Sequence, residues 1–488
     1  RKEEGKAMNH EILIETEVDG EDKLLSRLRD NRVRKGEVYR YDLPKGPQLP
    51  QRPVVVGLGP AGLFAGLILA QCGQRPLVLE RGLPVEEREK SVEAFWKRRI
   101  LDPESNVQFG EGGAGAFSDG KLTTGTGDAR IRKVLEELVK AGAPAEVLTD
   151  AKPHIGTDRL PGVVRRIREE IIALGGEVRF SAKVTGIRSK AGQLTGLEVE
   201  SRGQRETIEC SQAILAVGHS ARDVFQLLDS LGLPLQVKPF SVGARIEHPQ
   251  SLIDTAQYGA FAGHPALGAA DYKLSCHLPS GRSAFSFCMC PGGQVVASAS
   301  EQGGLVVNGM SPFKRDTGLA NSALVVSVDP GDFPAGPLGG MEFQRKYEHL
   351  AWQVSRDYRA PAQSSRSFVE KTAPDLKVGF RPSYRPGLVP ADLRKILPDF
   401  VIESLEHGLA DFERKLPGFS TRGLMIGVET RTSAPVRILR GEDGQSVNCR
   451  GLYPTGEGAG YAGGIMSAAM DGYHQARRLM GRFAVPEE

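Results

Sequence analysis

The chain has 488 residues, of which 40% are hydrophobic and 25% are charged, and its formal net charge is +3. This length predicts two or three domains, because one hydrophobic core rarely serves more than about 250–300 residues. The small net charge argues against a nucleic-acid binder that works through a broad basic face. The six cysteines show no framework spacing and the opening charged run has no apolar signal core behind it. We therefore expect reduced thiols in a cytoplasmic protein.

Residues 1–50 predict a short α+β appendage. Residues 11–18 alternate apolar and polar side chains like a strand, residues 21–29 predict a short helix, and residues 38–44 predict another strand. Residues 43–53 then contain four prolines and no periodicity, which is typical of a linker.

An uncharged stretch at 53–74 is long enough to cross a bilayer. Four glycines and a proline crowd its first half, however, so we predict a strand, a glycine turn and a helix over 54–73 and no membrane span. Residues 75–82 predict the next strand. Helices are expected at 128–142 and 161–176, and a series of strands with short turns at 177–218.

The pattern changes from about Phe240 onward. Helices are expected at 342–358 and 399–415, and the last fifty residues return to strand, glycine loop and helix. We interpret this middle region as a separate, mostly sheet-built domain. Its predicted strands lie at 240–248, 283–290, 294–300, 304–308 and 323–328.

The pattern G-x-G-x-x-G occurs three times, beginning at Gly57, Gly110 and Gly458. Only the first has an apolar strand before it and an apolar helix after it. An acidic residue, Glu80, also ends the second strand at the spacing expected for a dinucleotide-binding fold, where it would accept hydrogen bonds from a ribose diol.

Each residue of this first turn has a physical task. Gly57 permits the sharp turn off the strand, Gly59 lets the backbone approach a pyrophosphate, and Gly62 permits close packing of helix on strand. Free N–H groups at the start of the helix, with the positive end of its dipole, would bind the phosphates. The predicted turn comprises Gly57, Gly59, Pro60, Ala61 and Gly62.

These features fit NAD as well as FAD, and the later segments favour FAD bound non-covalently. AILAVG (213–218) and LYPTGEGAG (452–460) resemble further cofactor contacts of the two-dinucleotide-binding flavoproteins. In those proteins a late strand touches the ribityl chain, and a following helix points its N-terminus at the flavin ring. The matching residues here are Gly456, Glu457, Gly463, Gly464 and Ile465.

Longer strings extend this resemblance over roughly nine-tenths of the chain. The strings are NVQFGEGGAGAFSDGKL (106–122), AVGHSARD (216–223), KPFSVGARIEHPQ (238–250), FSFCMCPGG (285–293), ANSALVVSV (320–328) and YPTGEGAGYAGGIMSAA (453–469). They resemble the bacterial FAD-dependent dehydrogenases.

The resemblance implies an α/β fold with a Rossmann-like FAD-binding domain of the two-dinucleotide-binding type, split in sequence by an inserted, mostly-β α+β substrate domain. The expected boundaries are 1–50 for the appendage and linker, 51–239 and 441–488 for the FAD-binding domain, and 240–440 for the substrate domain. The FAD contacts that it implies beyond the turn and the C-terminal loop are Glu80, Arg81, Gly112, Gly113, Ala114, Ser118, Asp119, Lys121, Val184, Ala216 and Gly218.

The catalytic candidates come from the middle region. Cys288 and Cys290 are two residues apart on a predicted strand, so their side chains would share one face, either as a dithiol beside the flavin or as small buried residues. His248 would act as a general acid or base, or would be a capping or surface histidine; Arg245 lies on the opposite face of the same strand. We expect His219 to be structural or cofactor-lining, and no metal site.

The function predicted first is an FAD-dependent oxidoreductase that moves a hydride or two electrons between flavin and a small organic substrate, with NAD(P)H as a transient donor. One alternative is an FAD-dependent monooxygenase, although the C-terminal string TGEGAGYAGG differs from the Gly-Asp-Ala-Ala-His type of aromatic hydroxylases. Another is a flavin-binding protein that acts within a complex, with a protein electron donor. We expect no nucleic-acid partner, and the oligomeric state stays open.

Overall fold

The computed structural model describes residues 18–28, 30, 32–35, 41, 43, 48–125 and 127–481. Helix α1 (Glu21–Arg27) lies where the short helix was predicted. The strand predicted at 11–18 and most of the strand predicted at 38–44 lie outside the described residues.

A five-stranded parallel sheet forms the first part of the fold, in the order β19-β7-β1-β2-β3. All residues of β1, β2, β7 and β19 are buried, as expected for strands covered on both faces. The late strand β19 pairs with β7, so the sheet is completed only by a distant part of the chain. Its strands are β1 (Val54–Val56), β2 (Leu77–Leu79), β3 (Glu177–Arg179), β7 (Ala213–Leu215) and β19 (Leu452–Pro454).

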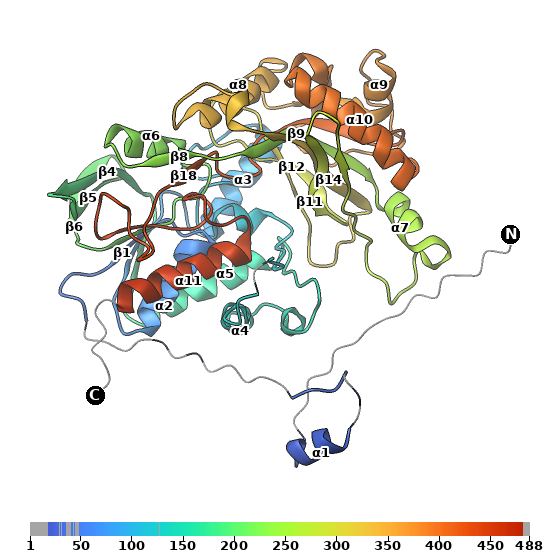
Figure 1. The fold of residues 1–488 in the computed structure, drawn as a ribbon. Helices are drawn as coiled ribbons and strands as arrows, with labels where there is room; N and C mark the ends of the chain where they lie inside the picture. Colours follow the sequence, from blue (N-terminus) through green and yellow to red (C-terminus); the bar gives the residue numbers. More distant parts are fainter. Residues whose placement is uncertain are drawn as a thin grey trace.

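Helices pack on one face of this sheet and a β-meander on the other. Figure 1 shows α11, from near the C-terminus, beside α2, and α2 also contacts α5. The α2–α11 contact is close, because a Cβ on Gly472 would clash with the carbonyl oxygen of Ala61. The helices are α2 (Pro60–Gln71), α5 (Leu160–Ala173) and α11 (Ile465–Gly481); the meander is β4 (Ala182–Lys190), β5 (Gln193–Ser201) and β6 (Gln204–Glu209).

Three further helices and a two-stranded ladder complete this part. Helix α3 (Val85–Arg98) follows β2, α4 (Ile131–Lys140) precedes α5, and α6 (Arg222–Ser230) follows β7. Strand β8 (Leu235–Val237) pairs with β18 (Val436–Ile438) where the chain leaves and re-enters this part.

A seven-stranded sheet in the order β10-β11-β14-β9-β17-β15-β16 builds the middle of the chain. Its pairs are antiparallel except β15–β16. Its strands are β9 (Phe240–Pro249), β10 (Ser275–His277), β11 (Ser283–Cys290), β14 (Leu319–Val328), β15 (Ala360–Ser364), β16 (Leu388–Pro390) and β17 (Leu424–Glu429).

Helices and a short ladder cover this second sheet. Helix α10 contacts β9, β10, β11 and β14, and the β12–β13 ladder contacts β9, β11, β14 and β17. Figure 1 shows α8, α9 and α10 gathered at the top of the molecule. The elements are α7 (Gln250–Tyr258), α8 (Gly339–Gln353), α9 (Ser365–Glu370), α10 (Asp399–Lys415), β12 (Gln294–Ala297) and β13 (Val307–Met310).

The predicted α/β class is confirmed, and individual boundaries shift. The strand expected at 304–308 begins only at Val307, because the backbone N–H of Leu305 donates instead to the carbonyl oxygen of Glu348. The helix expected at 342–358 spans 339–353. Among the described residues, no helix has both the length and the apolar character that crossing a membrane requires.

Candidate functional site

The glycine turn after β1 is shaped first by the chain's own backbone. Gly57 has φ +96°, and a Cβ there would clash with the carbonyl oxygen of Ala216 on the neighbouring strand. A Cβ on Gly62 would clash with the carbonyl oxygen of Gly57. Glycine is therefore needed at both positions for folding, with or without a ligand.

Gly59 is different, because its own protein neighbours leave room for a side chain. Its φ is −73°, and an added Cβ would meet the Cα of Gly113 at 3.6 Å, an ordinary van der Waals distance. Gly59 caps α2, whose first N–H groups have no intrahelical acceptors. The space in front of this helix end fits a phosphate group, which would approach too closely for a Cβ at position 59.

A second glycine loop lies against this turn. A Cβ on Gly113 would lie 2.9 Å from the Cα of Gly59, and a Cβ on Gly82 would lie 2.6 Å from the Cα of Gly110. The predicted contacts Gly112, Gly113 and Ala114 therefore stand beside the N-terminus of α2.

Arg88 holds this loop in place, and the sequence analysis missed it. Its guanidinium is buried and donates hydrogen bonds to five backbone carbonyls of the loop, at 2.5–3.3 Å. Burial lowers the pKa of Arg88 to about 10, against the charges of two nearby glutamates. An arginine on an otherwise amphipathic helix gave no signal of this role. The carbonyls belong to Asn106, Val107, Gly110, Glu111 and Gly113.

Glu80 is buried and ties the same segments together. Its carboxylate accepts hydrogen bonds from the backbone N–H groups of Leu58 (2.8 Å), Gly82 (2.9 Å) and Gly110 (3.0 Å). A carboxylate has about four acceptor positions, so one remains for a ribose hydroxyl. The next residue, Arg81, is paired and lies over the Phe109 ring at 4.1 Å.

The C-terminal loop reaches this region from the other end of the chain. The backbone N–H of Gly456 donates to Asp471 at 2.7 Å, and a Cβ on Gly456 would lie 2.7 Å from the Cβ of Ala61. Gly463 and Gly464 are exposed and directly precede α11, which begins at Ile465.

Small residues join the two helix N-termini. A Cβ on Gly458 would clash with the carbonyl oxygen of Gly218, and Ala61, Ala216 and Ala468 form one small cluster. A Cβ on Gly115 would lie 3.0 Å from the Ile465 side chain, which places the 110–118 loop beside the start of α11. The turn, this loop and both helix N-termini thus converge, as the sequence analysis expected.

The four remaining residues predicted to contact FAD lie in different environments around the two helix N-termini. The Ser118 hydroxyl closes a local turn with Gly115 and Gly120. Asp119 is buried and pairs with Arg315 at 2.6 Å, and Lys121 donates to the carbonyl oxygen of Met289. Val184 is buried in the core between the parallel sheet and the meander.

The seven-stranded sheet presents a buried charged cluster, which we call the Arg245 cluster. Arg245 lies 3.1 Å from Glu429, 3.0 Å from the side-chain oxygen of Asn321 and 2.6 Å from the carbonyl oxygen of Cys288. Burial raises the pKa of Glu429 to about 7, although the charge of Arg245 opposes the shift. Glu429 thus titrates near neutral pH; the sequence analysis missed it because it ends an uninterrupted apolar strand.

Cys288 and Cys290 lie at the edge of this cluster. The register between β11 and β14 shifts between Phe287 and Cys290, and Cys288 has φ 44°. The simple alternation expected for this strand is therefore wrong here, because the strand contains a bulge. The thiol of Cys290 nevertheless stays against Cys288, because it donates to the backbone carbonyl oxygen of that residue at 3.4 Å.

His248 is not part of this cluster, which corrects its place among the catalytic candidates. It is completely buried, its Nε2 donates to the carbonyl oxygen of Phe419 at 2.8 Å, and its ring packs on the Phe419 ring. It is a core residue rather than a surface or capping one, since its side chain points away from Arg245. Burial lowers the pKa of His248 to about 4.

His219 is buried between the two sheets. Its Nδ1 lies 3.9 Å from Glu457, and its Nε2 has no hydrogen-bond partner within the described chain. Burial lowers the pKa of His219 to about 3, and the charges of Arg431 and Arg222 add to this. It therefore stays neutral, consistent with a structural or cofactor-lining role.

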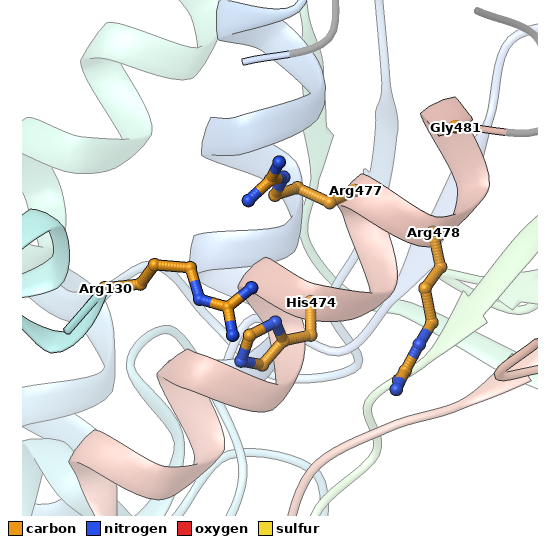
Figure 2. A pocket seen from close by; sticks show the side chains of 5 residues that line it. All are labelled: Arg130, His474, Arg477, Arg478 and Gly481. Atoms are coloured by element: carbon orange, nitrogen blue, oxygen red, sulfur yellow. The ribbon is translucent and has the colours of Figure 1, made fainter. Parts of the chain in front are cut away.

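A surface hollow of about 490 Å³ lies at the far end of α11. Figure 2 shows Arg130 beside His474, with Arg477 and Arg478 on the same helix as His474. It contains none of the predicted site residues, since the glycine turn lies at the opposite end of α11. Within the described ranges, no group of three or more His, Cys, Asp and Glu side chains is arranged to bind a metal ion.

Two comparisons identify the family. Residues 239–432 match the model of a family described as "FAD-dependent protein, C-terminal domain-like". An uncharacterized protein of Clostridium beijerinckii is 49% identical over 474 residues, which cover 96% of this chain and 88% of that protein. The chain belongs to this family of FAD-dependent flavoproteins.

Solved structures with weak likeness to this flavoprotein include other flavin enzymes. The flavin-dependent brominase Bmp2 is 11% identical, with 88% of this chain and 79% of that chain covered and a TM-score of 0.39. A geranylgeranyl bacteriochlorophyll reductase-like protein of Thermoplasma acidophilum is 12% identical, with coverages of 90% and 81% and a TM-score of 0.38.

The residues of the flavoprotein fit FAD. The open approach at Gly59, the free acceptor position on Glu80 and the exposed start of α11 suit the diphosphate, the ribose and the flavin ring in turn. Its parallel sheet, with helices on one face and a β-meander on the other, is a Rossmann-type fold.

Proposed function

We propose that this flavoprotein is a dehydrogenase or reductase that moves a hydride or two electrons between FAD and a small organic substrate. Two observations support it: the N-termini of α2 and α11 meet, and the second sheet holds a buried titratable cluster. Lys121, from the proposed FAD-binding part, donates to the carbonyl oxygen of Met289 beside this cluster. Bound FAD supplies the two-electron chemistry. The chain's part is to bind the cofactor, orient the substrate and handle the proton.

The Arg245 cluster is suited to holding and releasing the proton of the proposed reaction. Because the pKa of Glu429 lies near 7, its carboxyl group holds or releases a proton at physiological pH. Arg245 fixes the carboxyl at 3.1 Å, and the buried setting keeps water away. Glu429, positioned by Arg245, therefore replaces His248 as the proposed acid–base residue.

The division of labour is part of the proposal. Residues 51–239 and 441–488 would bind FAD, residues 240–440 would select a small-molecule substrate, and the chain would bind no nucleic acid. The family model matched at 239–432 supports a distinct middle unit. Free thiols at all six cysteines suit a reducing compartment, and we propose the cytoplasm.

Gly59→Ala tests cofactor binding, because the protein itself tolerates a Cβ at this position. We expect the variant to fold with native thermal stability and to bind FAD at least tenfold more weakly, as measured by flavin fluorescence during FAD titration. Gly162→Ala is the matched control, since position 162 also has room for a Cβ but lies in α5. Equal FAD affinity in Gly59→Ala and native protein would overturn the proposed cofactor position.

Anaerobic reduction tests the reaction class. The flavin absorbance of the FAD-loaded protein is followed while NADH, NADPH or candidate metabolites are added. Bleaching by one donor supports the dehydrogenase, provided that the same donor causes no oxygen uptake coupled to substrate hydroxylation in a parallel aerobic assay. Coupled oxygen uptake in that assay would instead indicate the monooxygenase, and anaerobic reduction by dithionite alone would point to a protein electron donor.

A further inference from the structure

We propose that Cys288 and Cys290 form a redox-active pair, which opens and closes as a disulfide and relays two electrons between the flavin and a small organic disulfide. The observations that support it are the bulged backbone, which turns the Cys290 thiol onto the backbone of Cys288, and the two cations that hold this backbone. The relay rests on the FAD binding proposed above.

The backbone at this pair departs from a regular strand. On a regular strand, the side chains of residues i and i+2 point to the same face, but the rise of two residues along the strand separates them. Here the positive φ of Cys288 and the register shift turn the chain, so the thiol of Cys290 lies 3.4 Å from the carbonyl oxygen of Cys288.

Two cations from different parts of the fold hold this conformation. Arg245, on β9, donates to the carbonyl oxygen of Cys288 at 2.6 Å. Lys121, which follows the proposed cofactor loop, donates to the carbonyl oxygen of Met289, between the two cysteines. A loop of the FAD-binding part is thereby fixed directly on the dithiol.

The same groups prepare one thiol as a nucleophile. The Cys290 side chain lowers the pKa of the Cys288 thiol; burial opposes this shift, and the charges of Lys121 and Arg245 support it. The pKa of the Cys290 thiol is raised by the Cys288 side chain and by burial. These opposite directions favour Cys288 as the nucleophile of the pair.

Charged groups from both parts of the fold act on Cys288. Glu429, on the second sheet, and Glu457, in the loop proposed for the ribityl side of FAD, both interact with it electrostatically. Cys72 and Cys210 differ, because burial raises their pKa to about 11 and about 12.

The electron transfer balances without any further reactant. The Cys288–Cys290 S–S bond breaks as it accepts two electrons and one proton from anionic reduced flavin, which leaves oxidised flavin, the Cys288 thiolate and the Cys290 thiol. Exchange with an organic disulfide RSSR then reforms the Cys288–Cys290 bond and releases RS⁻ and RSH.

The test uses the full chain loaded with FAD. The protein is oxidised with glutathione disulfide, freed of excess reagent and titrated anaerobically with dithionite. We expect native protein to take up twice as many electrons per FAD as Cys288→Ser or Cys290→Ala, because the disulfide accepts two beside the flavin. Cys276→Ser, on neighbouring strand β10, is the control and should behave as native.

Thiol counting in denaturant provides a second readout that does not depend on bound FAD. Oxidised native protein should lose two of its six thiols without a gain in mass from glutathione, and both variants should retain their remaining thiols as free or glutathione-bound. Six free thiols after oxidation, a glutathione adduct in place of an internal disulfide, or equal electron uptake in native protein and Cys288→Ser would each overturn the relay. Loss of FAD uptake with normal disulfide formation would count against the proposed function instead.

Discussion

The Nη2 atom of Arg222 lies 2.6 Å from the Oε1 atom of Glu348, and both side chains are buried at the junction of the two sheets. Arg431 pairs with the same carboxylate at 2.8 Å. Arg222 begins α6 beside the parallel sheet, whereas Glu348 lies on α8, so one carboxylate joins the FAD-binding part to the inserted part. Burial alone would raise the pKa of Glu348, but the two arginines hold it well below its usual range.

Glu348→Gln should therefore destabilise the whole chain. The substitution leaves the buried Arg431 without its paired carboxylate and Arg222 with Glu301 alone, and breaking a buried ion pair costs about 3–5 kcal/mol in comparable cases. Urea unfolding followed by circular dichroism measures the loss. The control is Glu342→Gln on the same helix, whose side chain is half exposed and should change stability by less than about 1 kcal/mol. Equal effects of the two substitutions would contradict this account of the junction.

Arg88→Met should release FAD. The methionine fills similar space but leaves five loop carbonyls without their donor, so the 106–113 loop loses its fixed position against the glycine turn. We expect purified Arg88→Met to lose bound flavin, seen as absorbance near the yellow flavin band, together with lower thermal stability. Arg98→Met, at the exposed end of α3, should retain flavin. Retention of flavin by both variants would show that the loop needs no such anchor.

Acidification should weaken the native state through His248. The pKa of this residue is about 4 in the folded chain against 6.5 for an unperturbed histidine, so the unfolded chain binds the proton first as pH falls. Stability attributable to neutral His248 is complete above pH 6.5 and is lost between pH 6.5 and 4.

The measurement is the free energy of unfolding from pH 7.5 to 4.5 for native protein and His248→Gln, in which an amide can still donate to Phe419. The slope with pH should be shallower in the variant, whatever its stability at neutral pH. His264→Gln, at an exposed loop position, should keep the native slope. Parallel slopes in His248→Gln and native protein would refute the assignment.

Much of the cofactor region was predictable because its constraints are local. The turn at Gly57 needs a positive φ, and strand, turn and helix follow one another within one short segment. The partners of buried charges were not predictable, because they come from distant segments. In the sequence, Arg88 does not differ from other helical arginines. The pKa of Glu429 rises only because distant segments, among them β13, bury this residue.

The two cysteines show the limit of periodicity. Alternation predicted that both side chains would share one face of a regular strand; the strand instead bulges at Cys288, where Lys121 and Arg245 contact its backbone, and no local pattern contains those contacts. The prediction for His248 was wrong for a related reason. The direction of its side chain was predicted, but the sequence does not show that the Phe419 ring covers it.

The position of β19 has a consequence during protein synthesis. Strand β7 lies between β1 and β19, and β19 leaves the ribosome only after every strand of the seven-stranded sheet has been made. Until then the nascent chain presents the open side of β7, a template for pairing with other polypeptides. A chain truncated before Leu452 would leave this edge of β7 unpaired. We therefore expect such fragments to precipitate or to be degraded rather than to accumulate as partly active protein.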